Sequence, residues 1–253
     1  MVFFYRLLPI LAALAVGFVF YFQLDNPLIF PWPALLGVAI TIIAMFAIAK
    51  RRVRFSDLME KVLPTILFQV ALIFGMLLAE GQFARGLIIF FGFLATFLCL
   101  ELLFLLSFMP SRYPVNGLSH INIALVPFIL WYVIANSVGL MAFLHSPPWI
   151  HVALLTALSI VLFRTTGHPG ATRDQNRLWV LVGGLTGLHI GLLGIVLPLS
   201  MAAQGAIGMV IFCAVLRMRR YLYHPFPGLR QAWMEASAAM IVLGVALGTS
   251  RWL

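Results

Sequence analysis

Residues 178–216 read LWVLVGGLTGLHIGLLGIVLPLSMAAQGAIGMVIFCAVL and contain no charged side chain. A single helix of this length would be about 58 Å long, roughly twice the hydrocarbon thickness of a bilayer. The stretch must therefore fold back on itself, and Pro198–Ser200 with the following Gln204 and Gly205 marks the turn. It predicts two membrane-spanning helices joined by a tight hairpin.

The composition of the whole chain extends this membrane prediction. Of its 253 residues, 63% are hydrophobic and 9% are charged, whereas soluble domains carry about 25% charged residues. A soluble core could not bury so much apolar surface, but lipid can cover it. Spans of about 20 residues fill the chain and leave no room for a separate soluble domain. We therefore expect an all-α polytopic transmembrane helix bundle, with residues 1–253 as one integral membrane domain.

The apolar runs give the number of spans. Nine runs are long enough, or nearly so, to cross about 30 Å of hydrocarbon, and they cover residues 7–22, 32–49, 63–79, 86–108, 120–143, 149–163, 178–198, 200–216 and 232–250. Two of these runs are short, so eight spans is the alternative count.

The basic residues predict the orientation of these spans. Fourteen of the sixteen Lys and Arg residues fall on one side of the nine predicted spans, and Arg85 and Arg251 fall on the other. The positive-inside rule places the N-terminus in the cytoplasm and the C-terminus outside, in a multi-pass protein of the cell membrane. The net charge of +9 is then explained by contacts with anionic lipids on the cytoplasmic side, so a nucleic-acid partner is not expected.

Three polar side chains lie deep in predicted spans. Ionisable groups are costly in hydrocarbon and are therefore the first place to look for function. Similar depths allow Gln69, Glu101 and His189 to meet in one layer as an intramembrane polar cluster. Such a cluster could relay protons or bind a substrate, or it could be a structural clasp between three helices. We favour the clasp, and the sequence assigns no catalytic residue.

The seventh predicted span carries a stripe of glycines. On a helical wheel five of them fall within an arc of about 100°, namely Gly183, Gly184, Gly187, Gly191 and Gly194. A stripe of small residues lets another helix approach closely. We expect this stripe to pack a helix, either of the same chain or of a membrane-protein partner, with ordinary packing as the favoured interpretation.

Two predicted cytoplasmic segments could bind anionic lipid headgroups. They contain candidate phosphate contacts at Arg112, His120, Arg164, His168 and Arg173. If the segments converge, these side chains would form a basic pocket. Ordinary cytoplasmic loops of a membrane protein have a similar composition, and we favour that interpretation.

Metal and cofactor sites are not indicated by the sequence. His145 and His151 flank a predicted outer turn without a Cys or Asp beside them, so we expect interfacial histidines and no metal. Lys50 and Lys61 both lie at span ends, which excludes a retinal Schiff base. Haem would need a second histidine at the depth of His189, and none is present. The sequence leaves any other cofactor unknown.

Three classes of function remain open. The first is a non-catalytic subunit or scaffold of a membrane complex, which the short loops and the few deep polar groups favour. The second is a carrier or channel for a lipid or small solute. The third is a membrane enzyme that acts on a lipid headgroup at the cytoplasmic face. The sequence favours the first class and leans away from an enzyme.

Overall fold

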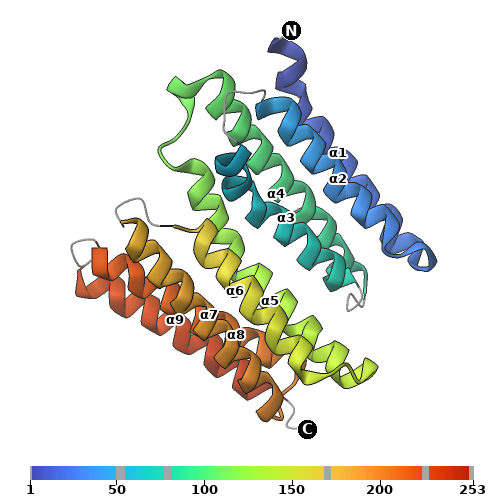
Figure 1. The fold of residues 1–253 in the computed structure, drawn as a ribbon. Helices are drawn as coiled ribbons and strands as arrows, with labels where there is room; N and C mark the ends of the chain where they lie inside the picture. The colour runs from blue at the N-terminus through green and yellow to red at the C-terminus, as the bar shows by residue number, and fades with distance from the viewer. Residues whose placement is uncertain (1, 50–54, 77–80, 168–171, 224–227, 251–253) are drawn as a thin grey trace. The chain divides into compact units, whose positions relative to one another are not determined.

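A computed structural model describes residues 2–49, 55–76, 81–167, 172–223 and 228–250 of the chain. Within these residues the fold is entirely helical (Figure 1). It consists of two short 3-10 helices, Pro27–Ile29 and Pro110–Arg112, and nine α-helices: α1 (Val2–Asp25), α2 (Trp32–Ala49), α3 (Phe55–Met76), α4 (Gln82–Phe108), α5 (Gly117–Leu144), α6 (Pro148–Thr165), α7 (Arg173–Val196), α8 (Met201–Tyr223) and α9 (Leu229–Thr249).

The membrane prediction is confirmed by the helices themselves. In the described part of the chain, each of the nine α-helices contains a stretch long and apolar enough to cross a bilayer. The chain is an all-α, multi-pass integral membrane protein. The predicted hairpin is also confirmed, because α7 ends at Val196 and α8 begins at Met201.

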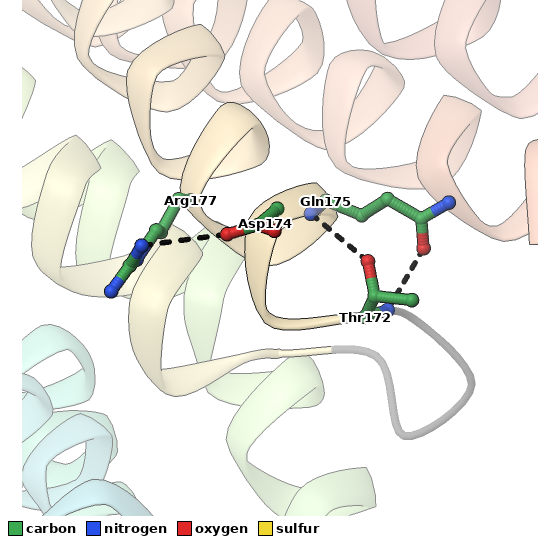
Figure 2. A network of polar contacts seen from close by, with 4 residues as sticks. All are labelled: Thr172, Asp174, Gln175 and Arg177. Carbon is green, nitrogen blue, oxygen red and sulfur yellow. Dashed lines mark hydrogen bonds and ion pairs between the residues drawn. The ribbon is translucent and has the colours of Figure 1, made fainter.

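The first turn of α7 shows why helix starts are harder to predict than spans. The helix begins at Arg173, five residues before the apolar run predicted from Leu178. A capping box starts it, since the Thr172 hydroxyl accepts from the backbone N–H of Gln175 at 3.3 Å and the Gln175 side chain accepts from the Thr172 N–H at 2.8 Å (Figure 2). Arg177 adds an exposed ion pair with Asp174 at 3.4 Å. Capping thus extends the helix through polar residues that hydropathy leaves out.

The chain divides into two compact units, Met1–Leu125 and Val126–Leu253. Helix α5 begins in the first unit and ends in the second. The expectation of one membrane domain over residues 1–253 stays a prediction.

In the first unit, α1 packs along α2 and α4, and α3 packs against α2 and α4. Phe20 of α1 is fully buried, and its ring occupies space next to two glycines. A Cβ added to Gly92 of α4 would lie 2.7 Å from the ring, and one added to Gly37 of α2 would lie 3.2 Å from it. The phenyl ring therefore interlocks three helices at positions where glycine leaves room.

In the second unit, α6 packs on α7, α7 on α8 and α8 on α9. Phe163 of α6 and Phe212 of α8 are fully buried, and their rings meet edge to face with centroids 5.0 Å apart. Helix α9 differs from the others. Only 6% of the residues in its membrane-spanning window are buried, against 28% for α7 and α8.

Candidate functional site

Gln69 is the centre of a fully buried hydrogen-bond cluster in the first unit. Its amide nitrogen donates to the hydroxyls of Thr41 at 2.7 Å and Thr96 at 2.6 Å. Each threonine in turn donates to a carbonyl one turn earlier in its own helix, that of Gly37 or Gly92. The cluster ties α3 to α2 and α4, which is the arrangement of a structural clasp.

Glu101 of α4 forms an ion pair with a residue of α1. Arg6 of α1 donates to its carboxylate. The guanidinium carbon of Arg6 also lies 5.2 Å from the centroid of the Phe104 ring. The ion pair compensates the charge of Glu101, and the cation–π contact stabilises the guanidinium of Arg6. The missed signal was the antiparallel course of α1 and α4, which brings the start of one beside the end of the other.

His189 of α7 has a partner on its own helix. Its Nδ1 donates to the Leu185 carbonyl at 2.7 Å, and the ring is exposed. Gln69 meets α4 at Thr96, about 7.5 Å along the helix from Glu101. The hydrogen bonds of the described residues therefore give each member of the predicted polar cluster a separate partner. The meeting of all three in one layer stays a prediction, because His189 belongs to the second unit.

The glycine stripe of α7 is covered by α6. A Cβ added at four of its five positions would come within 3 Å of α6: Gly183 at 2.5 Å from the Phe163 ring, Gly187 at 2.5 Å from the Leu155 carbonyl, Gly191 at 2.9 Å from the Val152 Cα, and Gly194 at 2.6 Å from His151 Nε2. At the fifth, Gly184, the nearest atom is in the Ile160 side chain at 3.2 Å. A second subunit could reach the stripe only by displacing α6, so a partner contact has to be sought on another face.

A buried arginine closes the end of α6. Arg219 of α8 is 2% exposed and donates to the carbonyls of Phe163 at 3.4 Å and Thr166 at 3.0 Å. The last carbonyls of a helix have no partner within it, and a cation there also interacts favourably with the helix dipole. Arg219 therefore holds α6 and α8 together.

The candidate headgroup contacts do not come together within one unit. Arg112 and His120 are exposed side chains of the first unit, and Arg164 and Arg173 are exposed side chains of the second. His168 lies outside the described residues. The basic pocket stays a prediction.

The two histidines beside the predicted outer turn have different environments. His145 is exposed and adopts a left-handed backbone conformation with φ 50°. The His151 side chain is 2% exposed, and its interfacial depth in the membrane stays a prediction. Its Nδ1 lies 2.8 Å from the Ser137 hydroxyl. His151 faces α7 at Gly194, where the glycine leaves room for the ring. The described residues contain no group of three or more His, Cys, Asp or Glu that could hold a metal ion.

Helix α9 carries a pair of glycines, Gly244 and Gly248, that was not among the predicted packing residues. Gly244 and Gly248 are exposed, and a Cβ at either position would meet no described atom within 4 Å. Ala246, on the opposite face, is buried. The Arg217 guanidinium donates to Glu235 at 2.9 Å, which ties the first turns of α9 to α8. The available signal was the four-residue spacing of GVALG over residues 244–248, a pattern typical of helix–helix contacts in membranes.

Comparison with known proteins brings no relative, since no protein-family model, curated protein or solved structure matches the chain. Among the described residues, the polar side chains of Gln69, Glu101 and Arg219 bind neighbouring helices. Helix α9 presents an exposed face that carries Gly244 and Gly248, and no described side chain packs on these two glycines.

Proposed function

We propose that the protein is a non-catalytic subunit of a membrane complex and that α9 is the helix through which it binds another subunit. One observation carries this proposal. The glycine pair of α9, Gly244 and Gly248, faces away from α8 and is exposed.

Lipid and protein require different things of the helix surface that they contact. Lipid chains are fluid and cover a leucine as readily as a glycine, so a lipid-facing helix gains nothing from small residues. A second helix does gain, because glycines four residues apart let two backbones approach closely and add van der Waals contacts. Ser237 and Ile241 are exposed on the same face of α9. The face thus combines a flat glycine surface with a hydroxyl and a large apolar side chain.

The polar groups inside the units support the same proposal. The amide of Gln69, the carboxylate of Glu101 and the guanidinium of Arg219 each hold two or more helices together. Groups engaged in this way serve stability. The proposal places the complex in the cell membrane with the N-terminus in the cytoplasm, because of the distribution of basic residues along the sequence.

The experiment is affinity purification of the tagged protein from its own membrane in a mild detergent, followed by native mass spectrometry. Gly244→Leu fills the proposed contact surface, and Val242→Leu is the matched control on the same helix near the side that faces α8. The proposal expects a stoichiometric partner that the wild type and Val242→Leu retain and that Gly244→Leu loses at an unchanged yield of folded protein. A partner retained equally by all three proteins would exclude the role of α9. A complex made only of copies of this chain would contradict a mixed complex and would show that the protein forms a homo-oligomer.

A second candidate function is lipid binding by a carrier, and one observation favours it. An apolar groove of about 770 Å³ lies on the second unit along α6 and α7, lined by side chains that include Ala153, Ala157, Leu188 and Leu192. Its size and lining suit an acyl chain. Ala157→Trp would fill the groove, and a carrier should then lose a defined co-purified lipid that the wild type retains. Lipids of bulk membrane composition on both proteins would exclude this candidate.

A further inference from the structure

The apolar groove along α6 and α7 in the second unit lies within the membrane-spanning part of both helices. It is lined by small, exposed side chains of α6, Ala153 and Ala157 among them, and by larger exposed side chains of α7, such as Leu188 and Leu192. Its volume is about 770 Å³. An apolar chain is the ligand that such a lining favours.

The hydroxyl in the lining is already satisfied within its own helix. Thr156 donates it to the Val152 carbonyl at 2.7 Å, one turn earlier in α6. A buried polar group without a partner costs free energy. An apolar ligand in the groove avoids this cost, because it takes no hydrogen-bond partner away from Thr156.

The groove has the length of the acyl chain of a membrane lipid. Along α6 its lining extends from Trp149 to Ile160, which is about 16 Å of helix. The acyl chains of one leaflet fill half of the bilayer core, or about 15 Å. One chain can therefore lie in the groove over most of its length.

Two arginines continue the groove faces of α6 and α7. Arg164 follows Ile160 by four residues, one turn further along the same face of α6. Arg177 precedes Leu181 by four residues and Leu188 by eleven, so it lies on the groove face of α7. Both arginines are exposed.

Both arginines lie at the same end of the groove. The rings of Phe163 on α6 and Trp179 on α7 stack with centroids 6.4 Å apart, which sets the last turn of α6 beside the first turns of α7. The opposite end is formed by residues 145–151 and 192–200, and these contain no Lys, Arg, Asp or Glu. The groove is therefore apolar along its length and positively charged at one end.

Arg177 can bind an anion although it already has a partner. Its Nη1 donates to Asp174 at 3.4 Å, and 81% of its side chain is exposed (Figure 2). A guanidinium has five N–H donors. A phosphate can therefore bind to it beside the aspartate.

A phospholipid supplies both chemistries that this surface lacks. Its phosphate suits arginine forks, and its acyl chain suits the groove. A chain whose headgroup lies at the arginines would run about 15 Å from Arg164 past Ile160, to the level of Ala153. A net negative headgroup matches the charge of this end, where Arg164 and Arg177 face one exposed carboxylate, that of Asp174.

We propose that an anionic phospholipid binds this groove, with its phosphate between Arg164 and Arg177 and one acyl chain along Ala157 and Ala153. The proposal rests on the lipid groove of the second candidate function and adds the class of lipid that the groove takes. It is independent of the proposed contact on α9.

The test is native mass spectrometry of the full chain, released from nanodiscs made of equal parts of dioleoyl phosphatidylglycerol and dioleoyl phosphatidylcholine. The two lipids share their acyl chains and their phosphate and differ in net charge. We expect the protein to retain one lipid molecule, mainly phosphatidylglycerol. Equal retention of both lipids would overturn the anionic headgroup and leave the groove of the second candidate function intact. Retention of neither lipid would overturn both.

Charge variants test the position of the phosphate. Arg164→Gln combined with Arg177→Gln should lower the preference for phosphatidylglycerol about tenfold, because two charges near the headgroup are removed. Arg230→Gln is the matched control, since Arg230 is exposed in the first turn of α9, and it should keep the preference. An unchanged preference in the double variant would overturn the proposal. All three arginines are exposed, so these variants should fold.

A groove variant tests the position of the acyl chain. Ala157→Trp places an indole ring in the exposed groove and should lower the retention of both lipids. Phosphatidylglycerol retained at the wild-type level would mean that the chain lies elsewhere, which would overturn the proposal. In the purification from the native membrane, a polypeptide that Ala157→Trp displaces would identify the occupant as a partner helix and would also overturn it.

Discussion

Helices α7 and α9 both carry glycines at spacings that favour close helix contacts, but their surroundings differ. On α7 the stripe lies against α6, and an added Cβ would come within 3 Å of α6 at four of the five positions. On α9, no described atom lies within 4 Å of a Cβ added to Gly244 or Gly248. Glycines spaced for close helix contact therefore have two different roles in this protein. The first stripe is part of the fold, and the second is available for a contact outside it.

Gly187→Leu should have the largest effect on stability. The added side chain would lie 2.5 Å from the Leu155 carbonyl, which is backbone and cannot move without shifting α6. Overpacking of this kind lowers the free energy of unfolding by about 3 kcal/mol or more when two helices must separate. Unfolding in mixed micelles with increasing SDS, followed by circular dichroism, measures the loss. An unchanged unfolding midpoint would mean that α6 does not cover the stripe.

Gly191→Ala should have an intermediate effect on the same helix. A methyl group there meets the Val152 Cα at 2.9 Å, so the two backbones must move apart by a few tenths of an ångström. The free energy of unfolding should fall by about 1 kcal/mol, because the better helix propensity of alanine offsets part of the strain. The same SDS titration detects it. A loss as large as that of Gly187→Leu would show that the stripe tolerates no separation at all.

Gly244→Leu should have the smallest effect on stability. The leucine side chain would point away from α8 into open space, so the free energy of unfolding of the isolated chain should stay within about 0.5 kcal/mol of the wild-type value. The measurement is made in detergent at a protein concentration where the chain is monomeric. A large destabilisation would show that α9 packs within its own chain more closely than the structure has it, and the comparison with α7 would fail.

The sequence predicts the spans because hydrocarbon thickness sets their length. Nine apolar runs, the hairpin at Pro198–Ser200 and the stripe of α7 all follow from hydropathy and helical periodicity. Helix α7 begins at Arg173, before its apolar run, because the capping box at Thr172 depends on hydrogen bonds between polar side chains and the backbone, which hydropathy does not register.

The polar contacts were harder to predict for a different reason. Depth in the membrane places Gln69 and Glu101 in similar layers, but depth says nothing about which neighbouring helix each one faces. Gln69 bonds to two threonines, and Glu101 pairs with Arg6. Partner choice depends on helix order and rotation, which one sequence does not reveal. The burial of His151 is equally hard to predict, since it depends on the gap that Gly194 leaves in a neighbouring helix.

The central claim, that the outward face of α9 binds another protein, is tested most directly by photo-crosslinking in the native membrane. A benzoylphenylalanine replaces Ile241, which is 66% exposed on the face of Gly244, and the control replaces Phe18 of α1, which is 67% exposed. The account predicts one discrete protein adduct from position 241, lost in combination with Gly244→Leu, and only lipid adducts from position 18. Lipid adducts alone from position 241 would contradict it and leave α9 as an ordinary lipid-facing helix.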